Sequence, residues 1–317
     1  MSRVLRLTAI VPATDGPPTL ARCAAAIDCA DDGPEEFIVV EEPHRASPAR
    51  ARNRGASEAS GDVLVFVDAD VLVHPDAFAR IRAAFDGDPE LAAVFGCYDD
   101  SPEAPGLVSR FRNLLHHYVH HSSPGPATTF WTGLGAIRRD AFRSVDGFDA
   151  DRYPVPSIED VELGIRLFER GGRILIDPEL QGTHLKAWTI ADMVRTDFAR
   201  RGIPWIKLML ERRAVSSALN LGWRHRLSTL AALGALAALA TGRPRTAAAA
   251  AAGLVALNGS FYGLLYRRGG PALAVGGVGL HALHLLTGAA AVPAAVASFA
   301  LDEKAGSNSG SGQRTLD

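Results

Sequence analysis

Short apolar runs alternate with segments of helical spacing through the first half of the chain. Four runs have the length of buried strands: Leu5–Val11, Glu36–Val40, Asp62–Val67 and Leu91–Phe95. Helical spacing marks the segments between them: 19–30, 46–59 and 76–85. This alternation predicts an α/β fold, Rossmann-like, with a mostly parallel sheet that carries helices on both faces. Ligands in such sheets bind beyond the carboxyl ends of the strands.

The pattern continues past residue 100 with longer elements. A segment with a helical centre at Gly106–His121 is followed by an apolar run at Phe130–Arg138. Helical spacing returns at Ile158–Arg170, and a short strand is predicted at Arg173–Ile176. We therefore expect the α/β region to reach about residue 189.

The last third of the chain has a different pattern. Apolar and basic residues interleave in Ile190–Arg213, which predicts an interfacial amphipathic helix, or a pair broken at Pro204. Between Leu227 and Leu301 there is no Asp, Glu or Lys. This segment predicts a transmembrane helical region, because helices of soluble proteins need a polar face. A buried helical subdomain is the alternative, and two to four membrane segments fit the pattern.

These patterns divide the chain into four regions. They are an α/β domain over 1–189, amphipathic helices over 190–226, membrane helices over 227–301 and a Gly/Ser-rich tail, expected to be disordered, over 302–317. Arginines near 224–226 and 267–268 favour a catalytic domain on the cytoplasmic side of the inner membrane, whereas Arg243 and Arg245 fall on the opposite side.

Charge and cysteine content exclude two classes of protein. The chain has 33 basic and 35 acidic residues, and this balance disfavours a nucleic-acid-binding protein. Its three cysteines, Cys23, Cys29 and Cys97, are too few and too irregular for a disulfide framework, so a reducing compartment fits. Neither observation defines the oligomeric state.

The clearest candidate for chemistry is the sequence VLVFVDADV, residues 63–71. A buried strand ends here on Asp68 and Asp70, whose side chains leave an extended backbone on the same side. Paired carboxylates at a strand end suit Mg²⁺ or Mn²⁺, which would neutralise a diphosphate. The simpler interpretation is a strand end with two solvated acids.

A second candidate is SIEDVELGIRL, residues 157–167. Ser157 has the position of a helix N-cap, which places Glu159 and Asp160 in the first turn, where the helix dipole favours a carboxylate. Such a carboxylate is suited to accept a proton from an acceptor hydroxyl. Helix capping alone explains the same residues.

Two further segments carry residues of interest. In FWTGLG, Gly133 permits close approach of a ligand to the backbone, and Trp131 has the ring to stack on a sugar. In LLHHYVHHSS, four histidines form two pairs at i,i+4 spacing. We favour a role for them at the acceptor opening or the membrane surface, and a structural zinc site is the alternative.

Taken in order, these segments resemble the family 2 glycosyltransferases, which have the GT-A fold. The resemblance is carried by LTAIVPATD, FIVVEE, ARNRGASEASGDVLVFVDAD, FWTGLGAIRRDAFRSVDGFD and IEDVELGIRL, and spans about residues 5–190. It implies an inverting glycosyltransferase with a nucleotide-sugar donor, UDP- or GDP-linked, and Mn²⁺ or Mg²⁺ as cofactor. Membrane placement and family habit point to a membrane lipid or polyprenyl phosphate as acceptor.

The resemblance also assigns roles to matching positions. Asp160 is the expected general base, with Glu159 beside it, and His184 joins Asp68 and Asp70 as a metal ligand. The expected donor-binding residues are Pro12, Ala13, Glu42, Arg52, Asn53, Asp68, Ala69 and Asp70. The expected acceptor-side residues are Trp131, Gly133, Arg201 and Trp205.

The chain departs from the family pattern in two places. Glu41–Glu42 stands where the family usually has Asp, and Pro204 replaces the second arginine of the RxxRW motif found in processive members. Two other functions stay open: a nucleotidyltransferase of related fold and a non-catalytic membrane scaffold. The first usually has a Gly- and Lys-rich phosphate loop, whereas this chain has PATDGPP after its first strand.

Overall fold

The computed structural model describes residues 5–213 and 222–311, and the chain divides into two compact units. The first, called the sheet unit, contains the described residues up to Trp188 together with residues 260–277. The helical unit contains residues 189–213, 222–259 and the described residues from Val278 onward.

The sheet unit is built on one mixed sheet. Among the described residues its eight strands are β1 (Leu7–Pro12), β2 (Glu36–Val40), β3 (Val63–Val67), β4 (Val71–Val73), β5 (Leu91–Tyr98), β6 (Gly125–Ala127), β7 (Leu134–Arg138) and β8 (Arg173–His184). Their order is β2-β1-β3-β7-β5-β8-β4, with β6 on β8. β1 pairs parallel with β2 and β3, and β5 with β8, while β7 is antiparallel to both β3 and β5. Five strands (β1, β2, β3, β5 and β8) therefore share one direction, as the pattern predicts.

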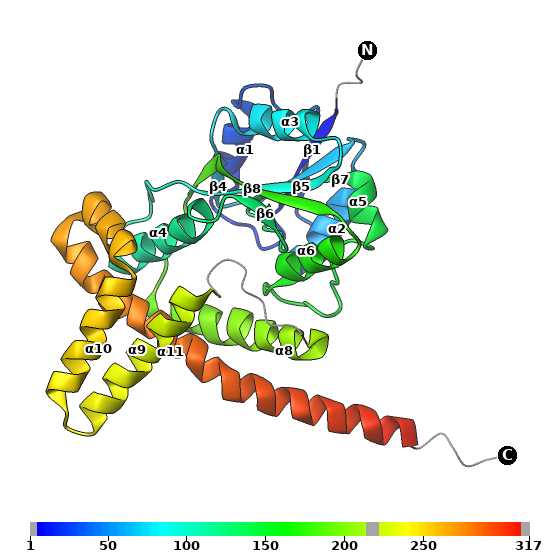
Figure 1. Cartoon of the computed structure of the whole chain (residues 1–317). Coiled ribbons are helices and arrows are strands. Elements are labelled where there is room, and N and C mark those ends of the chain that lie inside the picture. The colour runs from blue at the N-terminus through cyan, green and yellow to red at the C-terminus, as the bar shows by residue number, and fades with distance from the viewer. Residues whose placement is uncertain (1–4, 214–221, 312–317) are drawn as a thin grey trace. The chain divides into compact units, whose positions relative to one another are not determined.

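Helices cover both faces of the sheet (Figure 1). They are α1 (Leu20–Asp28), α2 (Pro48–Glu58), α3 (Ala77–Gly87), α4 (Leu107–His121), α5 (Arg139–Ser144) and α6 (Glu159–Glu169). Alternate residues of β3 enter two separate cores. Val65 packs with Ile27 of α1 and Phe78 of α3, whereas Phe66 packs with residues of α2, α5 and α6. Both faces are buried, and this explains why β3 is a continuous apolar run.

Three details differ from the elements predicted by the sequence. Strand β8 does not end at Ile176 but continues through Asp177–Pro178 to His184. The pairing of β8 with β5 shifts register between Phe95 and Cys97, and this shift accommodates the irregular residues of β8. The short strands β4 and β6 have too few residues for a detectable period. Helix α6 begins at Glu159 with Ile158 at the cap position, so Ser157 is not the N-cap.

The amphipathic segment of the helical unit forms a continuous helical run. It consists of α7 (Ile190–Arg195), the π-helical segment η1 (Thr196–Gly202) and α8 (Ile203–Arg212). The N–H of Ile203 bonds to the carbonyl of Phe198, five residues back. Pro204 lacks an N–H and its ring crowds the preceding turn, so the wider π turn accommodates it without a break.

The apolar segment forms three helices: α9 (Trp223–Ala240), α10 (Pro244–Leu257) and α11 (Gly259–Ser311). Helices α10 and α11 are separated at Asn258, whose amide donates to Ser228 Oγ at 2.8 Å and to the Leu254 carbonyl at 2.9 Å. Within α11, Gly270 has a positive φ of 68° and marks a kink. Glycine tolerates this conformation because it has no Cβ.

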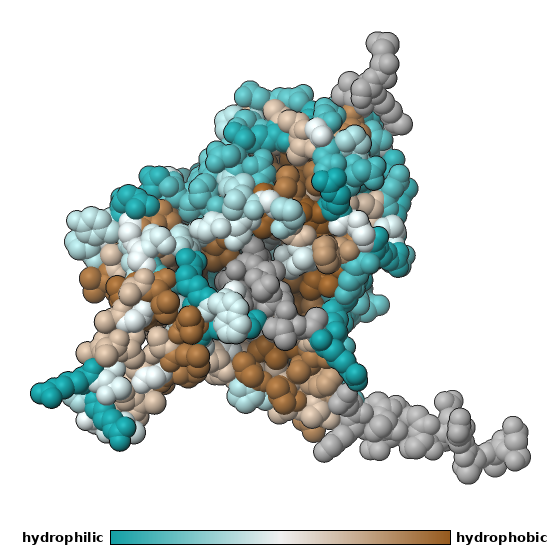
Figure 2. Space-filling model, in the orientation of Figure 1, coloured by the Kyte–Doolittle hydropathy of each residue, from teal (hydrophilic) through white to brown (hydrophobic). Residues whose placement is uncertain are grey.

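One helix of the described residues has the length and composition to cross a membrane. It spans Gly259–Asp302. Its most apolar 18-residue segment has a mean hydropathy of 1.6, and 22% of that segment is buried. The core helix of a soluble protein would be mostly buried. Exposed leucines recur along α9, at Leu227, Leu230, Leu233, Leu236 and Leu239, and hydrophobic residues dominate the visible surface of α9–α11 (Figure 2).

Candidate active site

The carboxylates of the DAD segment, Asp68 and Asp70, lie just after the end of β3. The start of β7 and the end of β8 are next to them. The Asp68 N–H donates to the carbonyl of Gly133, just before β7, at 3.2 Å. The Leu185 N–H, just after β8, donates to the carbonyl of Asp70 at 2.8 Å. Backbone hydrogen bonds therefore fix both aspartates in place, and their side chains are about a third exposed, 31% for Asp68 and 27% for Asp70.

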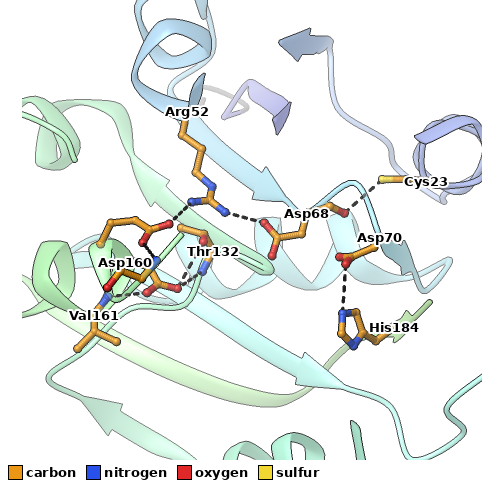
Figure 3. Close-up of polar contacts among 10 residues, drawn as sticks. Cys23, Arg52, Asp68, Asp70, Thr132, Asp160, Val161 and His184 are labelled. Atoms are coloured by element: carbon orange, nitrogen blue, oxygen red, sulfur yellow. Dashed lines mark hydrogen bonds and ion pairs between the residues drawn. The ribbon is translucent and has the colours of Figure 1, made fainter. Parts of the chain in front are cut away.

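A buried arginine holds one of the two aspartates (Figure 3). The Arg52 guanidinium from α2 donates to Asp68 Oδ1 at 2.7 Å and to Glu159 Oε1 at 3.1 Å. The side chains of Arg52 and Glu159 are 5% and 7% exposed. The second oxygen of Glu159 accepts from the Ser157 N–H at 2.8 Å. Both oxygens of Glu159 are thus engaged, and Arg52 ties α2 to the start of α6.

Asp160 has a different environment from the adjacent Glu159. Its Oδ2 accepts from the N–H and hydroxyl of Thr132 at 3.3 and 3.4 Å, and its Oδ1 from the Val161 N–H at 2.8 Å. The side chain is partly exposed and lies in the first turn of α6. Hydrogen-bond donors and the helix dipole stabilise its charged form while solvent can still reach it.

His184 lies beside the other aspartate, Asp70. Its Nε2 is 3.4 Å from Asp70 Oδ2, and its Nδ1 is 2.5 Å from Asn113 Oδ1 of α4. An amide oxygen only accepts, so Nδ1 carries a proton, and Nε2 is the ring nitrogen that points toward Asp70. The ring stacks on Tyr98 with centroids 4.0 Å apart and is buried. The ring orientation is therefore set on three sides.

The charge state of Asp70 follows from these neighbours. Burial alone would raise its pKa, but the hydrogen bond from His184 and the charges of His184 and Lys186 hold the pKa below its usual value. Asp70 is consequently a carboxylate at neutral pH. An ionised carboxylate beside an imidazole, whose Nε2 would release its proton to take a cation, is a donor set that accepts Mn²⁺ or Mg²⁺.

Trp131 and Gly133 occupy the segment that leads into β7. A Cβ on Gly133 would lie 2.1 Å from the Trp131 ring, so the glycine makes room for that ring. The ring packs against Tyr98, His116 and His120, with centroids 4.9, 4.6 and 5.2 Å away. Close approach at Gly133 thus serves an intramolecular aromatic cluster.

The predicted donor-binding residues gather at the carboxyl ends of β1 and β2 and on α2. Pro12 ends β1, and the Ala13 N–H donates to the Val40 carbonyl at 2.9 Å. Glu42 is exposed, and its carboxylate accepts from the His44 N–H at 2.9 Å. Asn53 uses its amide on the backbone of Phe148, donating to the carbonyl at 2.7 Å and accepting from the N–H at 2.9 Å.

The remaining predicted residues lie elsewhere. Ala69 is buried between the two aspartates. Arg201 and Trp205 belong to the helical unit, on η1 and α8, where Arg201 is exposed and Trp205 partly buried. Arg201 and Trp205 therefore belong to a different compact unit from Asp68, Asp70 and Asp160.

Sequence reasoning did not single out Asn113 or Thr132, the residues that orient His184 and Asp160. Both side chains are polar and almost completely buried, with exposed fractions of 1% for Asn113 and 2% for Thr132. The one sequence signal for Asn113 is a polar residue within SRFRNLLHH, a largely buried part of α4. Its partner is 71 residues away, so the sequence alone does not reveal it.

Comparison with known proteins places this arrangement in a family. Residues 9–146 match the model of glycosyltransferase family 2. The chain is 30% identical over 149 residues to a pre-mycofactocin glycosyltransferase of Mycobacterium tuberculosis, covering 45% of this chain and 31% of that protein. It is also 30% identical over 161 residues to a validoxylamine A glucosyltransferase of Streptomyces hygroscopicus subsp. jinggangensis, covering 42% and 38%. The chain spans about a third of the length of these two relatives.

A solved structure extends the likeness over most of the chain. A mannosyltransferase from Pyrobaculum calidifontis, in complex with GDP-Man and Mn²⁺, superposes with a TM-score of 0.51 at 19% identity, covering 92% of this chain and 88% of that one. At this identity the match establishes the fold. Residues 9–146 therefore match glycosyltransferase family 2, and the fold is that of the GT-A glycosyltransferases.

Proposed function

We propose that this protein is a metal-dependent, inverting glycosyltransferase that moves a sugar from a nucleotide-sugar donor to a lipid acceptor at a membrane. The observation that carries the proposal is the joint placement of Asp160, Asp68, Asp70 and His184 around the ends of β3, β7 and β8. A proton acceptor and a cation-binding donor set on neighbouring strand ends are the two parts that a single displacement requires.

The donor set fits a hard divalent cation. Asp70 and His184 would hold it through a carboxylate oxygen and the Nε2 lone pair, with Asp68 as a further ligand. When bound, Mn²⁺ or Mg²⁺ supplies positive charge that stabilises the departing nucleoside diphosphate. Arg52, which pairs with Asp68, adds a fixed guanidinium next to the same place.

Asp160 is the proposed general base. Thr132 orients its carboxylate through two hydrogen bonds, so one face of the carboxylate is held while the side chain stays partly exposed. The carboxylate takes the proton of the acceptor hydroxyl as that oxygen attacks the anomeric carbon opposite the leaving group. Attack from the opposite side inverts the anomeric configuration, and no covalent sugar–enzyme intermediate forms.

Donor binding falls to the carboxyl ends of β1 and β2 and to α2. The residues proposed there are Pro12, Ala13, Glu42, Arg52, Asn53 and Ala69. Pro12 offers partly exposed apolar surface for a base, with Ala13 buried next to it, and Glu42 has the exposed carboxylate. The family habit is a UDP- or GDP-linked sugar.

The membrane part of the proposal rests on the helical unit. The 44-residue apolar helix Gly259–Asp302 and the exposed leucines of α9 favour contact with acyl chains. We propose an inner-membrane protein with a cytoplasmic catalytic domain over 1–189, amphipathic helices over 190–226, membrane helices over 227–301 and a tail from residue 302. Trp131, Gly133, Arg201 and Trp205 are the residues proposed for the acceptor side.

The test is turnover of a panel of nucleotide sugars by the full chain in detergent, with Mn²⁺ or Mg²⁺ and a total lipid extract. We expect metal-dependent release of nucleoside diphosphate from one donor, lost in Asp70→Asn. Release of pyrophosphate instead would indicate a nucleotidyltransferase. Absence of turnover with every donor, together with no metal-dependent nucleotide binding, would support a scaffold.

A further inference from the structure

The four histidines of α4 separate into two pairs with different surroundings. His116 and His120 pack against Trp131 in the aromatic cluster. His117 and His121, one helical turn apart, lie beside Cys97 of β5 instead, and one ligand atom from each of these three residues lies within 4.8 Å of the other two. The i,i+4 spacing gives two imidazoles on one helix face, and a neighbouring strand adds a thiol.

The hydrogen bonds of these residues leave their ligand atoms available. His117 Nδ1 donates to the carbonyl of Tyr98 at 2.8 Å, so the lone pair of Nε2 is free. A ring N–H held by a backbone carbonyl is the usual outer contact of metal-binding histidines. Cys97 is fully buried, and its thiol donates to the Pro178 carbonyl at 3.3 Å. His121 is exposed and provides a route from solvent.

The electrostatic surroundings favour a cation. Burial, together with the charges of Asp177, Glu179, Asp99 and Asp100, raises the pKa of Cys97 to about 12. Burial also lowers the pKa of His117, which is therefore a neutral imidazole, the form that binds metals. The thiol by itself stays protonated and unreactive. A bound cation displaces the thiol proton to solvent, and no oxidation is involved.

We propose that Cys97, His117 and His121 form a second metal site, separate from the aspartate pair, that binds Zn²⁺. One thiolate and two imidazoles match the preference of Zn²⁺ for sulfur and nitrogen, whereas Mg²⁺ and Mn²⁺ prefer oxygen. Three protein ligands leave the fourth tetrahedral position to water. The separations, up to 4.8 Å, require a small inward shift, which the exposed His121 side chain can make.

The site would join α4 to β5. The same helix carries Asn113, whose amide oxygen orients His184. A zinc ion bound one turn further along α4 would hold that helix against the strand that also supplies Tyr98, the ring stacked on His184. The role proposed for the second site is therefore to hold α4 against β5 and so to support the geometry beside Asp70.

The test uses Co²⁺ as a spectroscopic substitute for Zn²⁺ on the full chain in detergent. We expect a near-ultraviolet thiolate-to-cobalt absorption band that accounts for one Co²⁺ per chain, besides any Co²⁺ held at the aspartate pair, and that disappears when Zn²⁺ is added. Cys97→Ser should abolish the band. His117→Gln and His121→Gln should each weaken Co²⁺ binding by about tenfold or more.

Matched variants keep this result specific. His116→Gln and His120→Gln, on the same helix, and the exposed Cys29→Ser should retain the band, and so should Asp70→Asn. The readout is independent of glycosyl transfer, so it can succeed or fail whatever the activity. The proposal is overturned if wild-type protein gives no thiolate band, or if the band survives Cys97→Ser.

Discussion

The two aspartates of the DAD segment, Asp68 and Asp70, have different electrostatic partners in the two halves of the candidate active site. On the first side Asp68 is paired with buried Arg52, which also holds Glu159, and this network joins α2 to α6. On the second side Asp70 faces His184, which Asn113 orients from α4. The first side already carries a fixed positive charge, whereas the second side presents a carboxylate and a lone pair.

This difference separates support from ligand binding. A carboxylate neutralised by arginine gains less from a cation, so Asp70 and His184 should contribute most of the metal affinity. The Arg52 network should contribute mainly to the stability of the sheet unit, because a buried charge left without its partner is costly. The predictions below test this division.

The largest effect is expected from Arg52→Met. The change leaves the buried Glu159 carboxylate without its cation, and it should lower the free energy of unfolding by about 3–5 kcal/mol. Urea denaturation in detergent, followed by circular dichroism, measures it. Arg50→Met, on the same helix but in an exposed pair with Asp151, should cost less than about 1 kcal/mol. Equal losses in the two variants would show that the Arg52 network has no special role.

Asp70→Asn should have the next largest effect. Loss of the carboxylate beside His184 should weaken Mn²⁺ binding by about 100-fold, whereas Asp68→Asn should weaken it by only about tenfold, because Arg52 already compensates Asp68. Electron paramagnetic resonance of free Mn²⁺ gives both affinities. Equal losses in the two variants would contradict the proposed difference between the two sides.

Asn113 should have a smaller and chemically specific effect. Asn113→Leu removes the acceptor for His184 Nδ1 and should weaken Mn²⁺ binding by about tenfold. Asn113→Asp keeps an acceptor oxygen and should restore most of the affinity. A purely structural role for Asn113 would instead make both variants alike in Mn²⁺ affinity.

The smallest effect concerns pH and the pair formed by His74 and Asp99. Their hydrogen bond, 3.0 Å long, raises the pKa of His74 above 6.5. A raised pKa means stability that is fully present below about pH 6.5 and is lost as pH rises through the folded value. His74→Gln should remove this part of the pH dependence, which is less than about 1 kcal/mol because the side chain is 34% exposed. Denaturation midpoints at about pH 6 and about pH 8 test it; an unchanged pH slope in the variant would refute it.

The sequence was sufficient for the overall fold and for the acids at the strand ends. Strand β3 is uniformly apolar and ends on Asp68 and Asp70, and parallel strands place their carboxyl ends together. The segment before β7 was predicted on other grounds, its glycine and its tryptophan. These features depend on local composition and on a general property of parallel sheets, so a single sequence carries them.

The partners of those acids depend on long-range packing, which the sequence does not display. Arg52 and Glu159 are 107 residues apart, and His184 and Asn113 are 71 apart. The sequence LLHHYVHH also does not show which histidine pair contacts which partner, because both pairs have the same spacing. Only the position of α4 against β5 directs one pair to Trp131 and the other to Cys97.

The most direct test of the proposed mechanism is turnover by Asp160→Asn under saturating donor and metal. We predict that kcat falls by about 10²–10⁴-fold while Mn²⁺ and nucleotide affinity stay near wild type, because only the proton acceptor is lost. Glu169→Gln, at the other end of α6, should keep wild-type turnover. An Asp160→Asn enzyme that turns over within a few-fold of wild type would contradict the assignment of Asp160 as the general base.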